Sequence, residues 1–157
     1  AVMALIMART EPFCHSVSFS VSPNNSDYYG SGGKADLQEL PIRKETTLSE
    51  VYEMTLHKRF GMTDCAMPMT YALEKKLEID TFIVYTDSET YYGDIHPSEA
   101  LQKYRKEMNL PNAKLVVMGM ASSCFTIADP KDKGMMDVVG FDSAAPQIVT
   151  DFSAGRL

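Results

Sequence analysis

Two runs of almost uninterrupted apolar residues constrain the fold of this chain more than any other feature. Residues 79–86 contain the stretch FIVY, and residues 113–120 read AKLVVMGM. Between them, Pro97 suits the first position of a helix, and an amphipathic pattern continues from it to Met108. Strands buried on both faces of a parallel sheet are apolar throughout and are joined by such helices. The sequence therefore predicts an α/β fold of the Rossmann-like three-layer kind, with a mostly parallel sheet.

Shorter patterns predict the remaining elements. Thr47, with Glu50 three residues later, matches a capping box, in which the two side chains bond the first amides of a helix. Pro68 suits the first turn of another helix, which we expect to start near Thr63 or Asp64. The other predicted elements are a helix over residues 1–9, an alternating strand over 13–21, an exposed loop over 23–34, a short strand around 37–42 and a final helix over 144–152.

Composition and charge limit the possible functions. A chain of 157 residues is long enough for one domain with a single core. Its net charge of -6 disfavours direct contact with phosphate backbones, and no apolar run is long enough for a membrane helix. The apolar start, residues 1–8, lacks the features of a signal peptide. Cys14, Cys65 and Cys124 are widely spaced, so we expect free thiols and a cytoplasmic location, which could extend to the nucleus.

A carboxylate follows the first apolar run directly. Asp87 stands after the stretch FIVYT, and ligands of parallel α/β sheets bind at the carboxyl ends of strands. Thr63 lies in the loop that opens the preceding predicted helix. Hydroxyl and carboxylate oxygens are the ligands that Mg²⁺ prefers, so Thr63 and Asp87 form a candidate cation site. In the simpler alternative, Thr63 only caps its helix and Asp87 only caps a loop.

Other chemistries find less support in the sequence. Residues 30–33 are the single glycine cluster, and no helical pattern follows them, which argues against a dinucleotide site. The chain has no phosphate-binding loop and no nucleophile elbow. Its histidines lack metal-ligand spacing, and His96 fits the region just before a helix. Asp87 with Glu89 loosely imitates a phosphatase pair, so a small phosphoryl-transfer enzyme remains an alternative.

Several short motifs follow one another in an order and spacing that resemble one family. They are GMTDCAMPM at 61–69, FIVYTDSET at 82–90, His-Pro at 96–97 with Tyr-Arg-Lys at 104–106, FTIADP at 125–130 and GFD at 140–142. Over nearly its whole length, the chain resembles the C-terminal von Willebrand factor A domain of the Ro (SS-A) autoantigen ribonucleoproteins, the TROVE-domain family.

The resemblance implies a von Willebrand A fold with a metal-ion-dependent adhesion site, abbreviated MIDAS. In the family, one loop of this site carries a DxSxS motif, another a threonine and another an aspartate. Thr63 matches the threonine and Asp87 matches the aspartate, but the DxSxS motif and the first central strand before it have no counterpart. We therefore expect residues 1–157 to be an N-terminally incomplete von Willebrand factor A-like domain. Mg²⁺ or another divalent cation would bind to the complete domain, and weakly or not at all to this fragment.

The resemblance also implies a non-enzymatic role. The RNA work of the family is assigned to an upstream ring of helical repeats, absent from these residues, which is said to bind Y RNAs and misfolded small RNAs. Residues 1–157 would then be a metal-binding and interaction module of a ribonucleoprotein in RNA quality control, with possible protein partners of its own. The alternative is a von Willebrand A domain that binds proteins and has no RNA role. The residues upstream in the full-length protein would distinguish the two.

Overall fold

The structure is a computed structural model, and it describes residues 2–22, 34–56, 63–87, 93–120, 126–140 and 142–157. The chain divides into two compact units, Ala1–Met62 and Thr63–Leu157, which are described separately. Several residues discussed above lie outside the described residues, namely 23–33, His57, Ser88, Glu89 and Cys124. No helix in the described part of the chain is long and apolar enough to cross a membrane.

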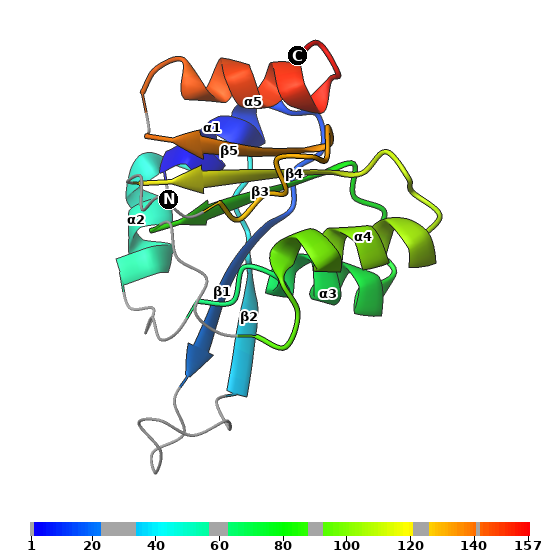
Figure 1. The fold of residues 1–157 in the computed structure, drawn as a ribbon. Helices are drawn as coiled ribbons and strands as arrows, with labels where there is room; N and C mark the ends of the chain where they lie inside the picture. Colours follow the sequence, from blue (N-terminus) through cyan, green and yellow to red (C-terminus); the bar gives the residue numbers. More distant parts are fainter. Residues whose placement is uncertain (1, 23–33, 57–62, 88–92, 121–125, 141) are drawn as a thin grey trace. The chain divides into compact units, whose positions relative to one another are not determined.

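The first unit joins two helices to a hairpin (Figure 1). Its core consists of buried apolar side chains from both helices and from the segment between β2 and α2, namely Leu5, Ala8, Ile42 and Val51. Strands β1 and β2 pair in antiparallel register. The elements are α1 (Val2–Thr10), β1 (Ser16–Ser22), β2 (Lys34–Leu40) and α2 (Leu48–Leu56).

Local chemistry explains where these elements begin. The amide of Thr47 donates to Glu50 Oε2 at 2.7 Å, and the amide of Glu50 donates to Thr47 Oγ1 at 3.3 Å. These reciprocal bonds confirm the predicted capping box at the start of α2. The predicted strand over 13–21 begins later, at Ser16, and Phe13 is 94% exposed instead of joining the apolar face of that strand.

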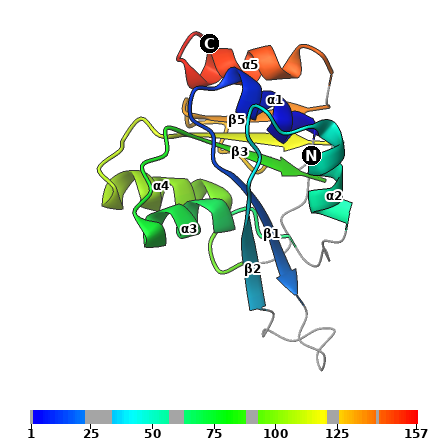
Figure 2. The same ribbon diagram turned by 180° about the vertical axis from the view of Figure 1, so that it is seen from behind.

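The second unit is built on a parallel sheet of three strands in the order β3-β4-β5 (Figures 1 and 2). It confirms both apolar runs as neighbouring parallel strands, with the predicted helix between them. The helix begins at Pro97, and the side chain of His96 accepts from the amide of Ser98 as its N-cap. The elements are α3 (Met67–Lys75), β3 (Thr81–Thr86), α4 (Pro97–Glu107), β4 (Lys114–Gly119), β5 (Met135–Val139) and α5 (Ala145–Ser153).

Helices cover both faces of this sheet. On one face, the rings of Phe82 in β3 and Tyr104 in α4 meet edge to face at 4.9 Å. Phe82 points toward α4, and successive strand residues point to opposite faces, so Thr81 points away from α4. Lys114 is the partner of Thr81 in β4 and points to the same face as Thr81. Its ammonium donates to the carbonyl oxygens of Phe152 and Ser153 at the end of α5. The α/β three-layer arrangement predicted from the sequence is confirmed.

Two details of this unit differ from the expectation. The helix expected to start at Thr63 or Asp64 starts at Met67, because Asp64 first forms a turn that bonds the amides of Ala66 and Met67. Strand β5 was not predicted from the sequence at all. It has five residues, Asp137 interrupts its apolar run, and alternate side chains along it are exposed.

Candidate functional site

The carboxyl ends of β3, β4 and β5 meet at one edge of the sheet, here called the strand-end edge. Asp87 follows β3 directly and is exposed there. The hydroxyl of Thr86 donates to Asp87 Oδ1 at 3.2 Å, and the carbonyl of Thr86 accepts from the amide of Met120 at 3.2 Å. The backbone just before Asp87 is therefore held by β4, and the carboxylate itself projects toward solvent.

Thr63 reaches the same edge from the segment that leads into α3. It is half-buried, and it stands directly before Asp64. Asp64 Oδ1 accepts from the amide of Ala66 at 2.9 Å, and the Asp64 carbonyl accepts from the amide of Met67 at 3.2 Å. This turn fixes the backbone beside Thr63. Because α3 leads back to the start of β3, its first residue lies near the end of the strands.

A close contact joins the Thr63 segment to the segment that follows Asp87. Gly93 has a φ of 124°, and a Cβ atom on it would lie 2.8 Å from the carboxyl carbon and from both carboxyl oxygens of Asp64. Burial raises the pKa of Asp64, an effect that the amide of Ala66 partly offsets and the charge of Asp94 reinforces. Asp64, the neighbour of Thr63, is thus packed against Gly93, which lies between Asp87 and α4 in the chain.

The fit of these residues to a divalent cation is partial. A threonine hydroxyl and an aspartate carboxylate suit a hard cation. Within the described ranges, no hydrogen bond joins Thr63 to Asp87, and no group of three or more His, Cys, Asp or Glu side chains is placed to hold a metal ion. Thr63 and Asp87 would therefore provide only part of the shell of a bound cation.

The second unit carries its basic side chains at one end, where carboxylates such as Asp80 and Asp132 also lie. Its Lys and Arg residues all lie toward the end where the strands start: at the ends of α3, α4 and α5, in the segment before β5 and at the first residue of β4. Among the described residues of this unit, those at the strand-end edge include the carboxylates Asp64, Asp87, Asp94, Glu99 and Asp142 and no Lys or Arg. Such an edge attracts cations and repels phosphate groups.

The parallel α/β sheet, with Thr63 and Asp87 at its strand-end edge, agrees with the von Willebrand A-type domain that the sequence resembles. The family model described as the Ro60 vWA domain matches residues 1–153, which spans both compact units. The chain belongs to the Ro60 vWA domain family.

Relatives of known name agree with this assignment. The RNA-binding protein RO60 of Caenorhabditis elegans is 47% identical over 121 residues, which cover 77% of this chain and 19% of that protein. The RNA-binding protein RO60 of Deinococcus radiodurans is 38% identical over 157 residues, which cover all of this chain and 27% of that protein. The crystal structure of the Deinococcus radiodurans RO (RSR) protein is similar to this chain, with a TM-score of 0.81 at 38% identity, over 99% of this chain and 28% of the solved one. The chain thus spans less than a third of the length of these relatives.

Sequence reasoning assigned no role to Asp64 or Gly93. Both were visible in the sequence, one directly after Thr63 and the other before α4. Gly93 could have been recognised because it follows the strand-end Asp87 at a place where the chain must turn before α4. Their partnership could not be predicted, because it joins positions far apart in the chain.

Proposed function

We propose that residues 1–157 form the metal-binding and interaction module of an Ro-type ribonucleoprotein, which binds Y RNAs and misfolded small non-coding RNAs. The observation that carries this proposal is the match of residues 1–153 to the Ro60 vWA domain. Two relatives with the name RNA-binding protein RO60 support it. In this proposal the module is not an enzyme, and RNA is bound by other parts of the full-length protein.

The acidic strand-end edge supports the view that this module binds a cation and that other parts of the full-length protein bind RNA. The carboxylates that the structure describes at this edge repel phosphate groups, so they are unsuited to contact RNA and suited to hold a cation. A bound divalent cation would place a positive charge on an otherwise negative surface and so offer a docking point for a carboxylate of a protein partner. The ligands that this chain contributes are the hydroxyl of Thr63 and the carboxylate of Asp87.

RNA binding by the full-length protein tests the first part of the proposal. We expect a labelled Y-type RNA to bind more tightly than a perfect duplex of equal length in filter-binding assays at fixed salt. We expect Asp87→Ala to leave this affinity unchanged within about twofold, because the carboxylate lies on a surface that repels phosphate. Equal affinity for both RNAs would contradict the RNA role and favour the alternative, a domain that binds only proteins.

Metal binding by the full-length protein tests the second part. We expect Asp87→Ala to weaken Mn²⁺ binding, measured by calorimetry, by about tenfold or more, because Mg²⁺-like ions depend on carboxylate ligands. Glu99→Gln is the matched control, since it removes an exposed carboxylate from the first turn of α4 at the same edge. Equal Mn²⁺ affinity of the wild type and Asp87→Ala would overturn the assignment of Asp87 as a ligand.

A further inference from the structure

We propose that Asp64 is a positioning residue, which fixes the backbone beside Thr63 through its own turn and through its contact with Gly93. This inference rests on the proposed metal-binding function. Asp64 would help to position a candidate metal ligand without itself binding the metal. The contact joins the residue after Thr63 to a residue that lies between Asp87 and α4.

Asp64 is anchored from its own side of the contact. Its side-chain Oδ1 accepts from the amide of Ala66 at 2.9 Å, and its carbonyl accepts from the amide of Met67 at 3.2 Å, where α3 begins. Both bonds fix the backbone one residue away from Thr63. The carboxyl group is half-buried, so it has little freedom to move away from the surface against which it packs.

Gly93 completes the contact from the other side. Its φ of 124° is a backbone conformation that residues other than glycine rarely adopt. Its Cα also lies so close to the Asp64 carboxyl group that a Cβ atom would overlap that group. Gly93 belongs to the segment between Asp87 and α4. A change in this contact therefore alters the backbone beside Thr63, while both candidate ligands stay in the sequence.

The first test replaces Gly93 and compares the result with a matched glycine. Gly140 also has a positive φ, of 90°, and follows β5 at the same edge, but no atom lies within 4 Å of a Cβ built there. We expect Gly93→Ala to weaken Mn²⁺ binding by the full-length protein about tenfold or more, and Gly140→Ala to weaken it less than about twofold. Free Mn²⁺ is measured by electron paramagnetic resonance, and hydrogen exchange in β4 checks that the sheet is intact.

The second test separates position from charge and does not depend on whether Gly93→Ala folds. Asp64→Asn keeps an acceptor for the amide of Ala66, whereas Asp64→Ala removes it. A positioning role predicts that Asp64→Asn keeps Mn²⁺ affinity within about threefold of the wild type and that Asp64→Ala loses about tenfold. If Asp64→Asn loses as much as Asp64→Ala, the charge is needed, and Asp64 acts as a ligand and not as a positioning residue.

The outcomes distinguish this inference from the function on which it rests. A wild-type protein that fails to bind Mn²⁺ overturns the proposed metal site and this inference with it. A wild type that binds, with Gly93→Ala binding equally well, leaves the metal site standing and overturns only the role of Asp64. Equal losses in Gly93→Ala and Gly140→Ala would also overturn it, because general backbone strain would then explain both.

Discussion

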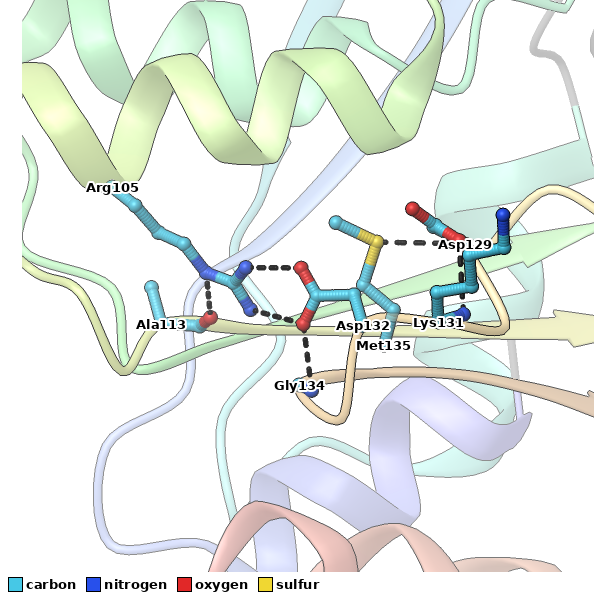
Figure 3. Close-up of polar contacts among 7 residues, drawn as sticks. All are labelled: Arg105, Ala113, Asp129, Lys131, Asp132, Gly134 and Met135. Atoms are coloured by element: carbon cyan, nitrogen blue, oxygen red, sulfur yellow. Dashed lines mark hydrogen bonds and ion pairs between the residues drawn. The ribbon is translucent and has the colours of Figure 1, made fainter.

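Replacement of Asp132 by Ala is expected to destabilise the unit Thr63–Leu157 by about 3 kcal/mol at pH 7, because the charge of Arg105 would stay in place without its partner. The two side chains form an ion pair in which Arg105 is 15% exposed and Asp132 is 19% exposed (Figure 3). At this degree of burial, the loss of one partner costs far more than it does on an open surface.

The ion pair holds three segments of the chain together. Arg105 Nε donates to the carbonyl of Ala113 at 2.7 Å, just before β4, while its two terminal nitrogens donate to the two carboxyl oxygens of Asp132. Asp132 Oδ1 also accepts from the amide of Gly134 at 2.8 Å, just before β5. The end of α4 is thereby fixed to the starts of two neighbouring strands. Loss of the ion pair should loosen both strand starts.

Urea unfolding measures the loss of unfolding free energy. Hydrogen exchange of the β4 amides measures how far the strand is loosened. Gly134→Ala is an independent way to break the pair, because a Cβ on Gly134 would overlap the guanidinium of Arg105 while both charges remain. Lys131→Ala is the control, since this exposed side chain in the same segment should contribute less than about 0.5 kcal/mol. A loss below about 1 kcal/mol for Asp132→Ala would show that the pair behaves as an ordinary surface pair.

The same pair should make stability depend on pH in a defined direction. Hydrogen bonds from Arg105 lower the pKa of Asp132 below its ordinary value, and the amide of Gly134 adds to this. A carboxyl group with a lower pKa in the folded state contributes stability above its unfolded pKa of about 3.9, and this contribution is lost as pH falls through the folded value. The stability difference between the wild type and Asp132→Asn should therefore be full at pH 7 and shrink below about pH 4.

Local signals in the sequence were sufficient for most of the elements. The bonds of the capping box at Thr47 and Glu50 span three residues, and the proline that starts α4 acts through its own ring, so both could be read from the sequence. Residues 79–86 and 113–120 are apolar enough to predict buried neighbouring strands. The chemistry of Thr63 and Asp87 was predicted in the same way, and their role as metal ligands stays a prediction.

Contacts between distant residues explain what the sequence did not reveal. Strand β5 takes its structure from pairing with β4, and its own five residues carry a weak pattern. The pair of Arg105 and Asp132 joins positions whose partnership depends on how α4 packs. The contact of Asp64 with Gly93 likewise exists only after the sheet has brought two loops to one edge.

Replacement of Tyr104 by Phe is expected to cost about 2 kcal/mol, although it removes a single oxygen atom. The side chain of Tyr104 is fully buried. Its hydroxyl donates to the carbonyl of Leu77 at 2.6 Å and accepts from the amide of Ile79 at 2.7 Å, in the segment between α3 and β3. Phenylalanine leaves both backbone groups without this partner, while the ring contact with Phe82 is kept.

Hydrogen exchange of the Ile79 amide reports this loss directly, and urea unfolding gives its size. Tyr52→Phe is the matched control, because Tyr52 lies on α2 and is 57% exposed. Removal of its hydroxyl oxygen should change the free energy of unfolding by less than about 0.5 kcal/mol. If Tyr104→Phe costs no more than this control, water replaces the hydroxyl without loss, and the bonds do not hold the segment.

Alkaline pH provides a further check on the Tyr104 hydroxyl. Burial raises the pKa of Tyr104 above its ordinary value, and the bond from Ile79 offsets this only in part. A group with a higher pKa in the folded state contributes stability below its unfolded pKa of about 10, and loses it as pH rises toward the folded value. The advantage of the wild type over Tyr104→Phe should therefore be constant near neutral pH and shrink above about pH 10. An advantage that stays constant through this range would mean that the hydroxyl is as free to ionise in the folded protein as in the unfolded chain.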